Sequence, residues 1–123
     1  MEEPVARVIR LEEAKELKLS GRKSLEIISA KESAGTVTLR HVEIPVPSPG
    51  DQRRSPHSHS DCEECIHVLS GRGLLSTDDG DKALQPGDTA IIPPGELHVT
   101  RNTGDTPLVL LCFFPLGDLN VHG

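Results

Sequence analysis

Short apolar runs alternate with turn signals from residue 24 to near the C-terminus. The runs, rich in aliphatic and β-branched residues, are SLEIIS, TVTLRHVEIPV, SPHSH, ECIHVLS, GLLST, KALQ, DTAIIP, LHVTRN and PLVLLCFFP. Clusters of Gly, Pro, Asn and Asp separate them at intervals of about 8–12 residues, which is typical of an all-β sandwich or barrel. The pattern therefore predicts a single all-β domain, either a sandwich or a barrel, over residues 24–116.

The two ends of the chain lack this alternation of apolar runs and turn signals. Residues 1–23 form a polar lead-in, in which Leu11, Ala14 and Leu17 recur at the spacing of a short helix or a single turn. Residues 117–123 form a C-terminal tail. Prolines alternate over residues 45–49, so this stretch is expected to be an edge or an exit loop, because proline cannot donate to a central sheet ladder.

Composition narrows the class of protein. The 123 residues fit one domain, and a core with two Phe and neither Tyr nor Trp must be built from Val, Ile and Leu. No apolar run approaches the roughly 20 residues needed to cross a bilayer. The charged N-terminus carries no secretory signal, and three cysteines do not suggest a disulfide framework, so a cytoplasmic protein is expected. A net charge of −6 and the scarcity of aromatics argue against nucleic-acid binding.

Histidine is the informative residue type. His57 and His59 are two positions apart, so a strand would direct both imidazoles to one face. Glu64 begins the next apolar run, and His98 follows a Pro-Pro-Gly turn. Three imidazoles and one carboxylate suit one divalent transition metal, namely Fe, Mn, Ni, Cu or Zn. The ligand types alone do not choose among these metals.

Two segments resemble the paired motifs of the cupin family. GDQRRSPHSHSDCEECIHVLSG, from Gly50 to Gly71, resembles the first motif, and GDTAIIPPGELHVTRN, from Gly87 to Asn102, resembles the second. The second fits at every motif position, whereas the first has six residues between Gly50 and His57 where the family pattern has five. The extra residue is expected to lengthen a loop.

The resemblance implies a double-stranded β-helix, or jelly roll, in which two antiparallel sheets form a barrel around a metal held by His57, His59, Glu64 and His98. Glu63 is the alternative to Glu64, but the six-residue step to Gly71 and the alternation with Ile66 and Val68 favour Glu64. The motif glycines are expected at turns, and Asn102 is expected to hydrogen-bond at a turn or strand end. Small cupins of this type also imply a homodimer.

Two further residues are candidates for the lining of the metal cavity. In the final run, alternation places Cys112 on the same face as Leu110 and Phe114, which the resemblance directs toward the metal; the alternative is a cysteine that packs as a small hydrophobe. Arg40 lies in the run TVTLRHV, where an inward-facing arginine needs an anionic partner such as a substrate carboxylate or enolate. The alternative is an arginine that faces solvent.

Cys62 and Cys65 form a Cys-x-x-Cys pair that flanks Glu64. No second pair accompanies them, so the spacing is interpreted as incidental, with a peroxide-sensitive site as the alternative.

The predicted function is that of a metal-dependent enzyme acting on a small oxygen-rich or anionic metabolite. With Fe or Mn, the favoured metals, the resemblance implies dioxygenase-like chemistry. The alternatives are a non-redox lyase, isomerase or decarboxylase using the same site, or a non-catalytic module that binds or senses a small molecule.

Overall fold

The computed structural model describes residues 5–31, 36–50, 56–58 and 62–117. Within these ranges the elements are the 3-10 turn η1 (Leu11–Glu13) and the strands β1 (Lys15–Leu17), β2 (Lys23–Ile28), β3 (Thr38–Ile44), β4 (Glu64–Ser70), β5 (Gly73–Thr77), β6 (Gly80–Leu84), β7 (Thr89–Ile92), β8 (His98–Asn102) and β9 (Leu108–Phe114). The predicted all-β fold is confirmed. Each predicted run contains a strand except SPHSH, where the described residues 56–58 form one isolated bridge.

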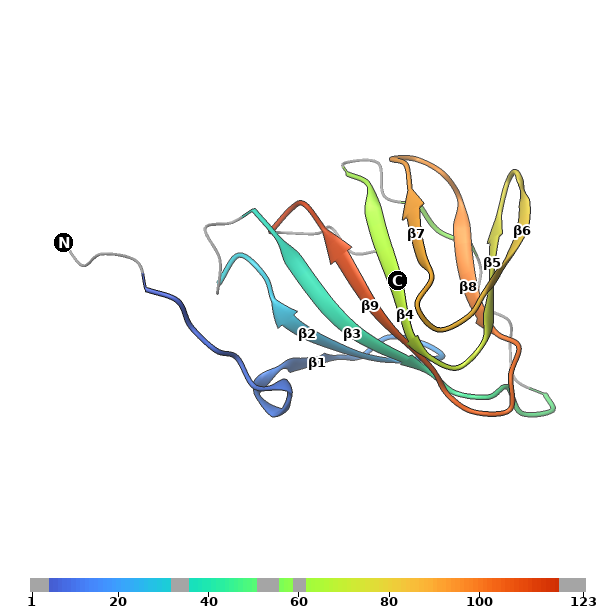
Figure 1. The fold of residues 1–123 in the computed structure, drawn as a ribbon, viewed down its shortest axis with the longest axis horizontal. Helices are drawn as coiled ribbons and strands as arrows, with labels where there is room; N and C mark the ends of the chain where they lie inside the picture. The colour runs from blue at the N-terminus through green and yellow to red at the C-terminus, as the bar shows by residue number, and fades with distance from the viewer. Residues whose placement is uncertain (1–4, 32–35, 51–55, 59–61, 118–123) are drawn as a thin grey trace.

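The strands form two antiparallel sheets that face each other (Figure 1). The larger sheet has the order β1-β2-β3-β9-β4-β7, and the smaller has the order β6-β5-β8. The last strand, β9, lies between β3 and β4, so the C-terminal part of the domain completes the centre of the larger sheet. This is the jelly-roll arrangement, with an interior between the sheets that the described strands do not close into a continuous hydrogen-bonded barrel.

Alternation along the central strands decides which side chains enter that interior. In β4, Glu64, Ile66 and Val68 are buried while the intervening side chains are more exposed, as the sequence pattern predicted. In β3 and β9 the same alternation places Arg40 directly opposite Cys112. Because residues paired across antiparallel strands lie on one face of the sheet, both side chains enter the interior.

Aliphatic side chains from both sheets form the core. Leu108, Leu110 and Val68 have at most 2% of their surface exposed, and Leu75 and Leu84 join them from the smaller sheet. Each such side chain contributes about 1.5–3 kcal/mol relative to an exposed position. Some of the core side chains, among them Ile66 and Leu110, also line the cavity that contains Glu64 and His98.

The motif glycines occupy turns with a left-handed backbone. Gly71, Gly87 and Gly95 have φ of +85°, +92° and +83°, as predicted for conformations that side chains other than glycine rarely adopt. Gly71 has a second constraint, because a Cβ there would lie 2.4 Å from the backbone oxygen of Pro107. The β4–β5 turn therefore packs directly against the chain entering β9.

The polar lead-in contributes to the sheet. The expected helix or turn is the three-residue η1, and the chain then forms β1, which pairs with β2 over Lys15–Leu17. Past β3 the proline-containing stretch forms no strand in its described residues, as expected of an exit loop.

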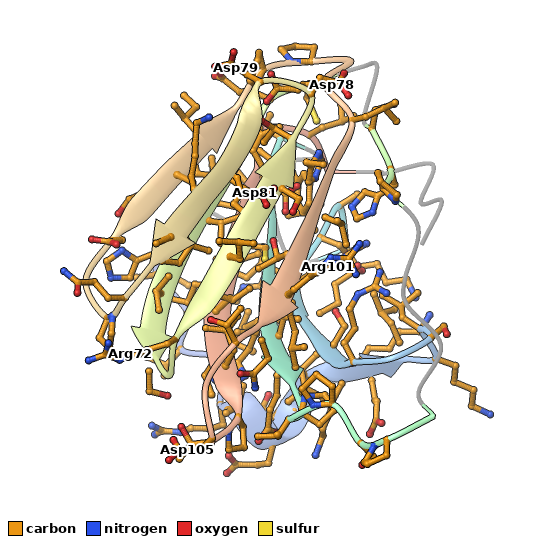
Figure 2. The ribbon with its side chains drawn as sticks, turned by 90° about the vertical axis from the view of Figure 1, so that its right-hand side faces the viewer. Arg72, Asp78, Asp79, Asp81, Arg101 and Asp105 are labelled. Carbon is orange, nitrogen blue, oxygen red and sulfur yellow. The ribbon has the colours of Figure 1, made fainter. Side chains whose placement is uncertain are left out.

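Charged residues lie on the strands of the smaller sheet and in the turns at its two ends. Asp81 lies on β6 and Arg101 on β8, while Asp78 and Asp79, in the β5–β6 turn, lie at the opposite end of this sheet from Arg72 and Asp105 (Figure 2). In the part of the chain that the structure describes, there is no helix of the length and apolar character that a membrane crossing requires.

Candidate metal centre and adjoining cavity

Three predicted ligands come together between the two sheets. His57 lies in the segment before β4, Glu64 begins β4 in the larger sheet, and His98 begins β8 in the smaller sheet. One ligand atom from each side chain lies within 4.8 Å of the corresponding atoms of the other two. The cluster thus joins residues separated by up to 41 positions through the pairing of the strands.

The backbone holds His57 and His98 in register. His57 N donates to His98 O at 2.9 Å, and His98 N donates to His57 O at 2.8 Å, which forms the isolated antiparallel bridge. The two imidazole rings lie with centroids 4.5 Å apart and planes at 61°. The bridge therefore sets the position of His57 although no described strand contains it.

The hydrogen bonds of His98 define its protonation. Its Nδ1 lies 3.0 Å from the backbone oxygen of Glu96, which can only accept, so Nδ1 carries a hydrogen. Its Nε2 lies 3.1 Å from Glu64 Oε1. Burial disfavours the imidazolium, but the hydrogen bonds to Glu64 and to the Glu96 carbonyl, with the charges of both carboxylates, outweigh it and raise the pKa of His98.

This geometry fits a cation between His98 and Glu64. With Nδ1 protonated, a neutral His98 presents a lone pair at Nε2 toward a carboxylate oxygen, so two acceptors face each other unless a proton or a metal ion lies between them. An Nδ1–H held by a carbonyl is also the common support of a histidine that ligates a metal through Nε2. The ligand atoms of one transition metal lie within about 4 Å of one another, close to the separations in this cluster.

The other two metal-ligand candidates differ in position. His59 lies outside the described residues, so its place relative to the cluster stays a prediction. Glu63 is exposed, whereas Glu64 is 5% exposed and belongs to the cluster, which favours Glu64 over Glu63.

A cavity adjoins the cluster and is lined by residues from both sheets. Cys112 is 7% exposed in its wall, which it shares with Glu64. Burial, followed by the charge of Glu64 and a hydrogen bond to Glu64, raises the pKa of Cys112 well above its ordinary value. Cys112 is therefore a neutral thiol that contacts a metal-ligand candidate, rather than a thiolate.

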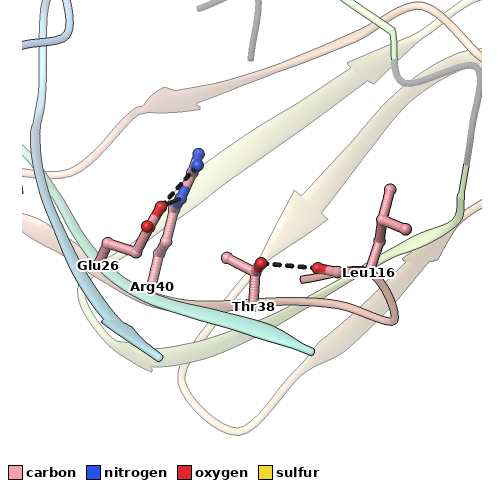
Figure 3. A network of polar contacts seen from close by, with 4 residues as sticks. All are labelled: Glu26, Thr38, Arg40 and Leu116. Atoms are coloured by element: carbon pink, nitrogen blue, oxygen red, sulfur yellow. Dashed lines mark hydrogen bonds and ion pairs between the residues drawn. The ribbon is translucent and has the colours of Figure 1, made fainter. Parts of the chain in front are cut away.

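Arg40 also faces the cavity and is 6% exposed. Its Nε and Nη2 donate to Glu26 Oε2 at 3.0 and 2.9 Å, from the neighbouring strand β2 (Figure 3). Its guanidinium also lies 5.7 Å from the centroid of the Phe114 ring. The anionic partner that an inward-facing arginine requires is thus supplied by the chain itself, where the sequence suggested a substrate.

Sequence reasoning missed three polar residues of this region. Arg22 and Ser24 line the cavity, and Glu26 pairs with Arg40. Arg22 falls in the segment interpreted as a polar lead-in, and Ser24 and Glu26 alternate along β2 toward the interior. For Ser24 and Glu26, the signal that could have found them is this alternation. It ends after Glu26, where the register shifts and Ile28 lies opposite Leu39.

The cysteine pair is reduced. Cys62 is buried and Cys65 half-buried, and both are free thiols, as is Cys112. Cys65 lies on the outer face of β4, opposite Phe113 and Ile91, so it faces away from the cluster that contains Glu64. Incidental spacing and a peroxide-sensitive site both stay predictions for this pair.

Known proteins share this chain's sequence pattern and fold. A family model described as a cupin domain matches residues 46–114, more than half of the chain. An uncharacterised protein of Methanocaldococcus jannaschii is 41% identical over 56 residues, covering 46% of this chain and 45% of its own. A glucose-6-phosphate isomerase of Pyrococcus abyssi is 38% identical over 64 residues, covering 48% of this chain and 34% of its own. The chain thus spans less than half the length of these curated relatives.

A solved structure extends the similarity to nearly the whole fold. The crystal structure of a predicted oxalate decarboxylase from Thermotoga maritima superposes with a TM-score of 0.76 at 22% identity, covering 89% of this chain and 99% of the other. At that identity the likeness concerns the fold. The family model and the jelly-roll topology agree, and the chain belongs to the cupin family.

Proposed function

We propose that this protein is a metal-dependent enzyme that converts a small oxygen-rich or anionic metabolite in the cavity beside His57, Glu64 and His98. The observation that carries the proposal is the convergence of two imidazoles and a carboxylate within 4.8 Å at the wall of a cavity lined by both polar and apolar side chains. His59 is proposed as a fourth ligand on the strength of the motif it shares with His57.

A bound divalent metal would act as a Lewis acid toward substrate oxygens, or with Fe or Mn would support chemistry with dioxygen. The chain's own residues prepare the site for it. The Glu96 carbonyl fixes the hydrogen on Nδ1 of His98, and this directs Nε2 of His98 toward Glu64 Oε1 at 3.1 Å. The apolar wall from Val42, Leu110 and Phe114 excludes water from one side of the cavity.

Two reaction classes remain candidates. Dioxygenase-like oxidation is the class that the motif resemblance implies for Fe or Mn. Non-redox isomerisation or decarboxylation is supported by the names of the similar proteins, a glucose-6-phosphate isomerase and a predicted oxalate decarboxylase. The relatives' names favour non-redox isomerisation or decarboxylation. The proposed substrate is a small molecule that is oxygen-rich or anionic.

We also propose a cytoplasmic homodimer. The three free cysteines suit a reducing compartment. The outer face of the larger sheet carries neighbouring apolar side chains, with Leu39 opposite Phe113, Phe113 opposite Cys65, and Cys65 opposite Ile91. Ile91 and Phe113 are 66% and 38% exposed, which supports a second copy of the chain covering this face. Sedimentation should give a dimer for the unaltered chain and a monomer for Ile91→Glu, with Val46→Glu, at an exposed position outside the strands, as the control.

The first test is metal content by mass spectrometry on protein purified without an affinity-metal step, beside His98→Ala. We expect roughly one transition metal per chain, lost in the variant. The metal then directs the assay, with dioxygen uptake against diols, β-diketones and catechols for Fe or Mn, and lyase and isomerase substrates for Zn or Ni. Absence of metal after reconstitution would overturn the proposal, and ligand-induced stabilisation without turnover would indicate a binding module.

A further inference from the structure

The cavity has two arginines in its wall, and only one of them has a carboxylate partner among the described residues. Arg40 is paired with Glu26 at 2.9 Å, so its charge is matched within the fold. Arg22, which precedes β2, donates from Nη1 to the backbone oxygen of Ser20 at 2.9 Å, and no described carboxylate pairs with it. The guanidinium of Arg22 therefore contributes a positive charge to the cavity that the described part of the protein does not neutralise by contact.

A buried hydroxyl lies close by along the chain. Ser24 is 1% exposed, lines the same cavity, and its Oγ has no hydrogen-bond partner in the described part of the structure. A buried polar atom without a partner is uncommon in folded proteins, since leaving it unpaired costs about 1–3 kcal/mol. Ser24 Oγ is thus a donor and acceptor available to a molecule in the cavity.

The surroundings of Arg22 connect it to the metal-centre side of the cavity. Burial is the largest cause of the lowered pKa of Arg22, and the charge of Arg40 adds to it, whereas the charge of Glu64 acts in the opposite direction. An arginine remains protonated even so. The guanidinium therefore lies within electrostatic range of Arg40 on β3 and Glu64 on β4, and it loses hydration without gaining an ion pair among the described residues.

We infer that Arg22 and Ser24 form the position that binds a carboxylate group of the small-molecule ligand. The inference rests on the proposed function, because the molecule whose carboxylate binds Arg22 and Ser24 is the same molecule whose other oxygens would bind the metal. A carboxylate accepts from a guanidinium and a hydroxyl at once and restores the hydrogen bonds that both groups lack. Its single negative charge matches the one unmatched arginine, whereas a phosphate dianion would bring an additional buried charge.

The test uses the full chain, as purified and after chelator treatment, with butyrate as the carboxylate probe and butyramide as its neutral isostere. Binding is followed by nuclear magnetic resonance titration, with inorganic phosphate as a separate arm. We expect butyrate to bind and butyramide not to, and Arg22→Gln to weaken butyrate binding about tenfold or more. Ser24→Ala should weaken it several-fold, and Arg22→Lys, which keeps the charge, should lie between the unaltered chain and Arg22→Gln.

Lys23→Gln is the matched control, since it removes a positive charge from the adjacent, exposed position. Equal butyrate affinity in Arg22→Gln, Lys23→Gln and the unaltered chain would overturn the inference, as would phosphate binding more tightly than butyrate. If Arg22→Gln does not fold, Arg22→Lys and Ser24→Ala decide the outcome. Metal content is measured on every variant, so loss of the carboxylate position with normal metal is distinguished from failure of the metal centre.

Discussion

Arg40 directs both Nε and Nη2 at a single carboxylate oxygen of Glu26, at 3.0 and 2.9 Å, across the β2–β3 pair (Figure 3). The side chains are 7% and 18% exposed, so the ion pair is largely removed from water. This pair neutralises one wall of the cavity and, among the described residues that line the cavity, leaves Arg22 as the cation available to a ligand.

Glu26→Gln is expected to destabilise the fold, because it leaves the Arg40 guanidinium buried without its counter-charge. The expected loss is about 3 kcal/mol in the free energy of unfolding, measured by chemical denaturation. Adding Arg40→Met should recover most of that loss, since a buried pair can be replaced by apolar side chains at little cost. Glu43→Gln, on the opposite face of β3, is the control, and a loss no greater than in that variant would contradict the prediction.

Glu64→Gln is expected to abolish metal binding while Glu63→Gln retains it. The two residues are adjacent, but Glu64 belongs to the cluster with His57 and His98 and Glu63 is exposed. A neutral amide also cannot supply the negative charge that the carboxylate lends to a cation. Metal per chain, measured by mass spectrometry, should fall only in Glu64→Gln; equal retention in both variants would count against Glu64 as a ligand.

Asn102→Ala is expected to destabilise the protein by about 2–3 kcal/mol. The amide of Asn102 donates to the backbone oxygens of Ile44 and Thr106 at 3.0 and 2.8 Å, and its Oδ1 accepts from Gly104 N at 2.8 Å. It therefore joins the end of β3 to the β8–β9 turn. Thr103→Ala, at an exposed neighbouring position, is the control in the same unfolding measurement, and a similar small effect in both would refute this role.

The sequence predicted the strands and their inward faces because both depend on local pattern. Alternation in β4 placed Glu64 on the inward face, and alternation in β9 grouped Cys112 with Leu110 and Phe114 on the face that the cupin resemblance directed inward. The motif glycines identified turns with positive φ. Register between distant strands has no such local signal. The pairing of β2 with β3 is what places Glu26 beside Arg40, so the partner of that arginine could not be predicted from the run containing it.

The lead-in was interpreted as polar connecting chain for a related reason. Its residues have no strong period, and β1 spans only three residues, so its pairing with β2 depends on the sheet already being present. Arg22 therefore carried no sign of its position at the cavity. A charged residue next to a strand is most often solvated, and only the tertiary structure distinguishes this one.

Gly71→Ala is expected to be much more harmful than Gly87→Ala, although the two glycines have nearly the same φ, +85° and +92°. A Cβ at Gly87 meets nothing within 4 Å, so that variant should lose only the cost of a left-handed backbone, about 1–2 kcal/mol. A Cβ at Gly71 would lie 2.4 Å from Pro107 O and 2.8 Å from the Leu108 Cα, which are backbone atoms that cannot rotate away. The additional loss should be about 1–3 kcal/mol. Chemical denaturation of both variants measures the difference, and equal losses would show that the β4–β5 turn does not pack tightly against the start of β9.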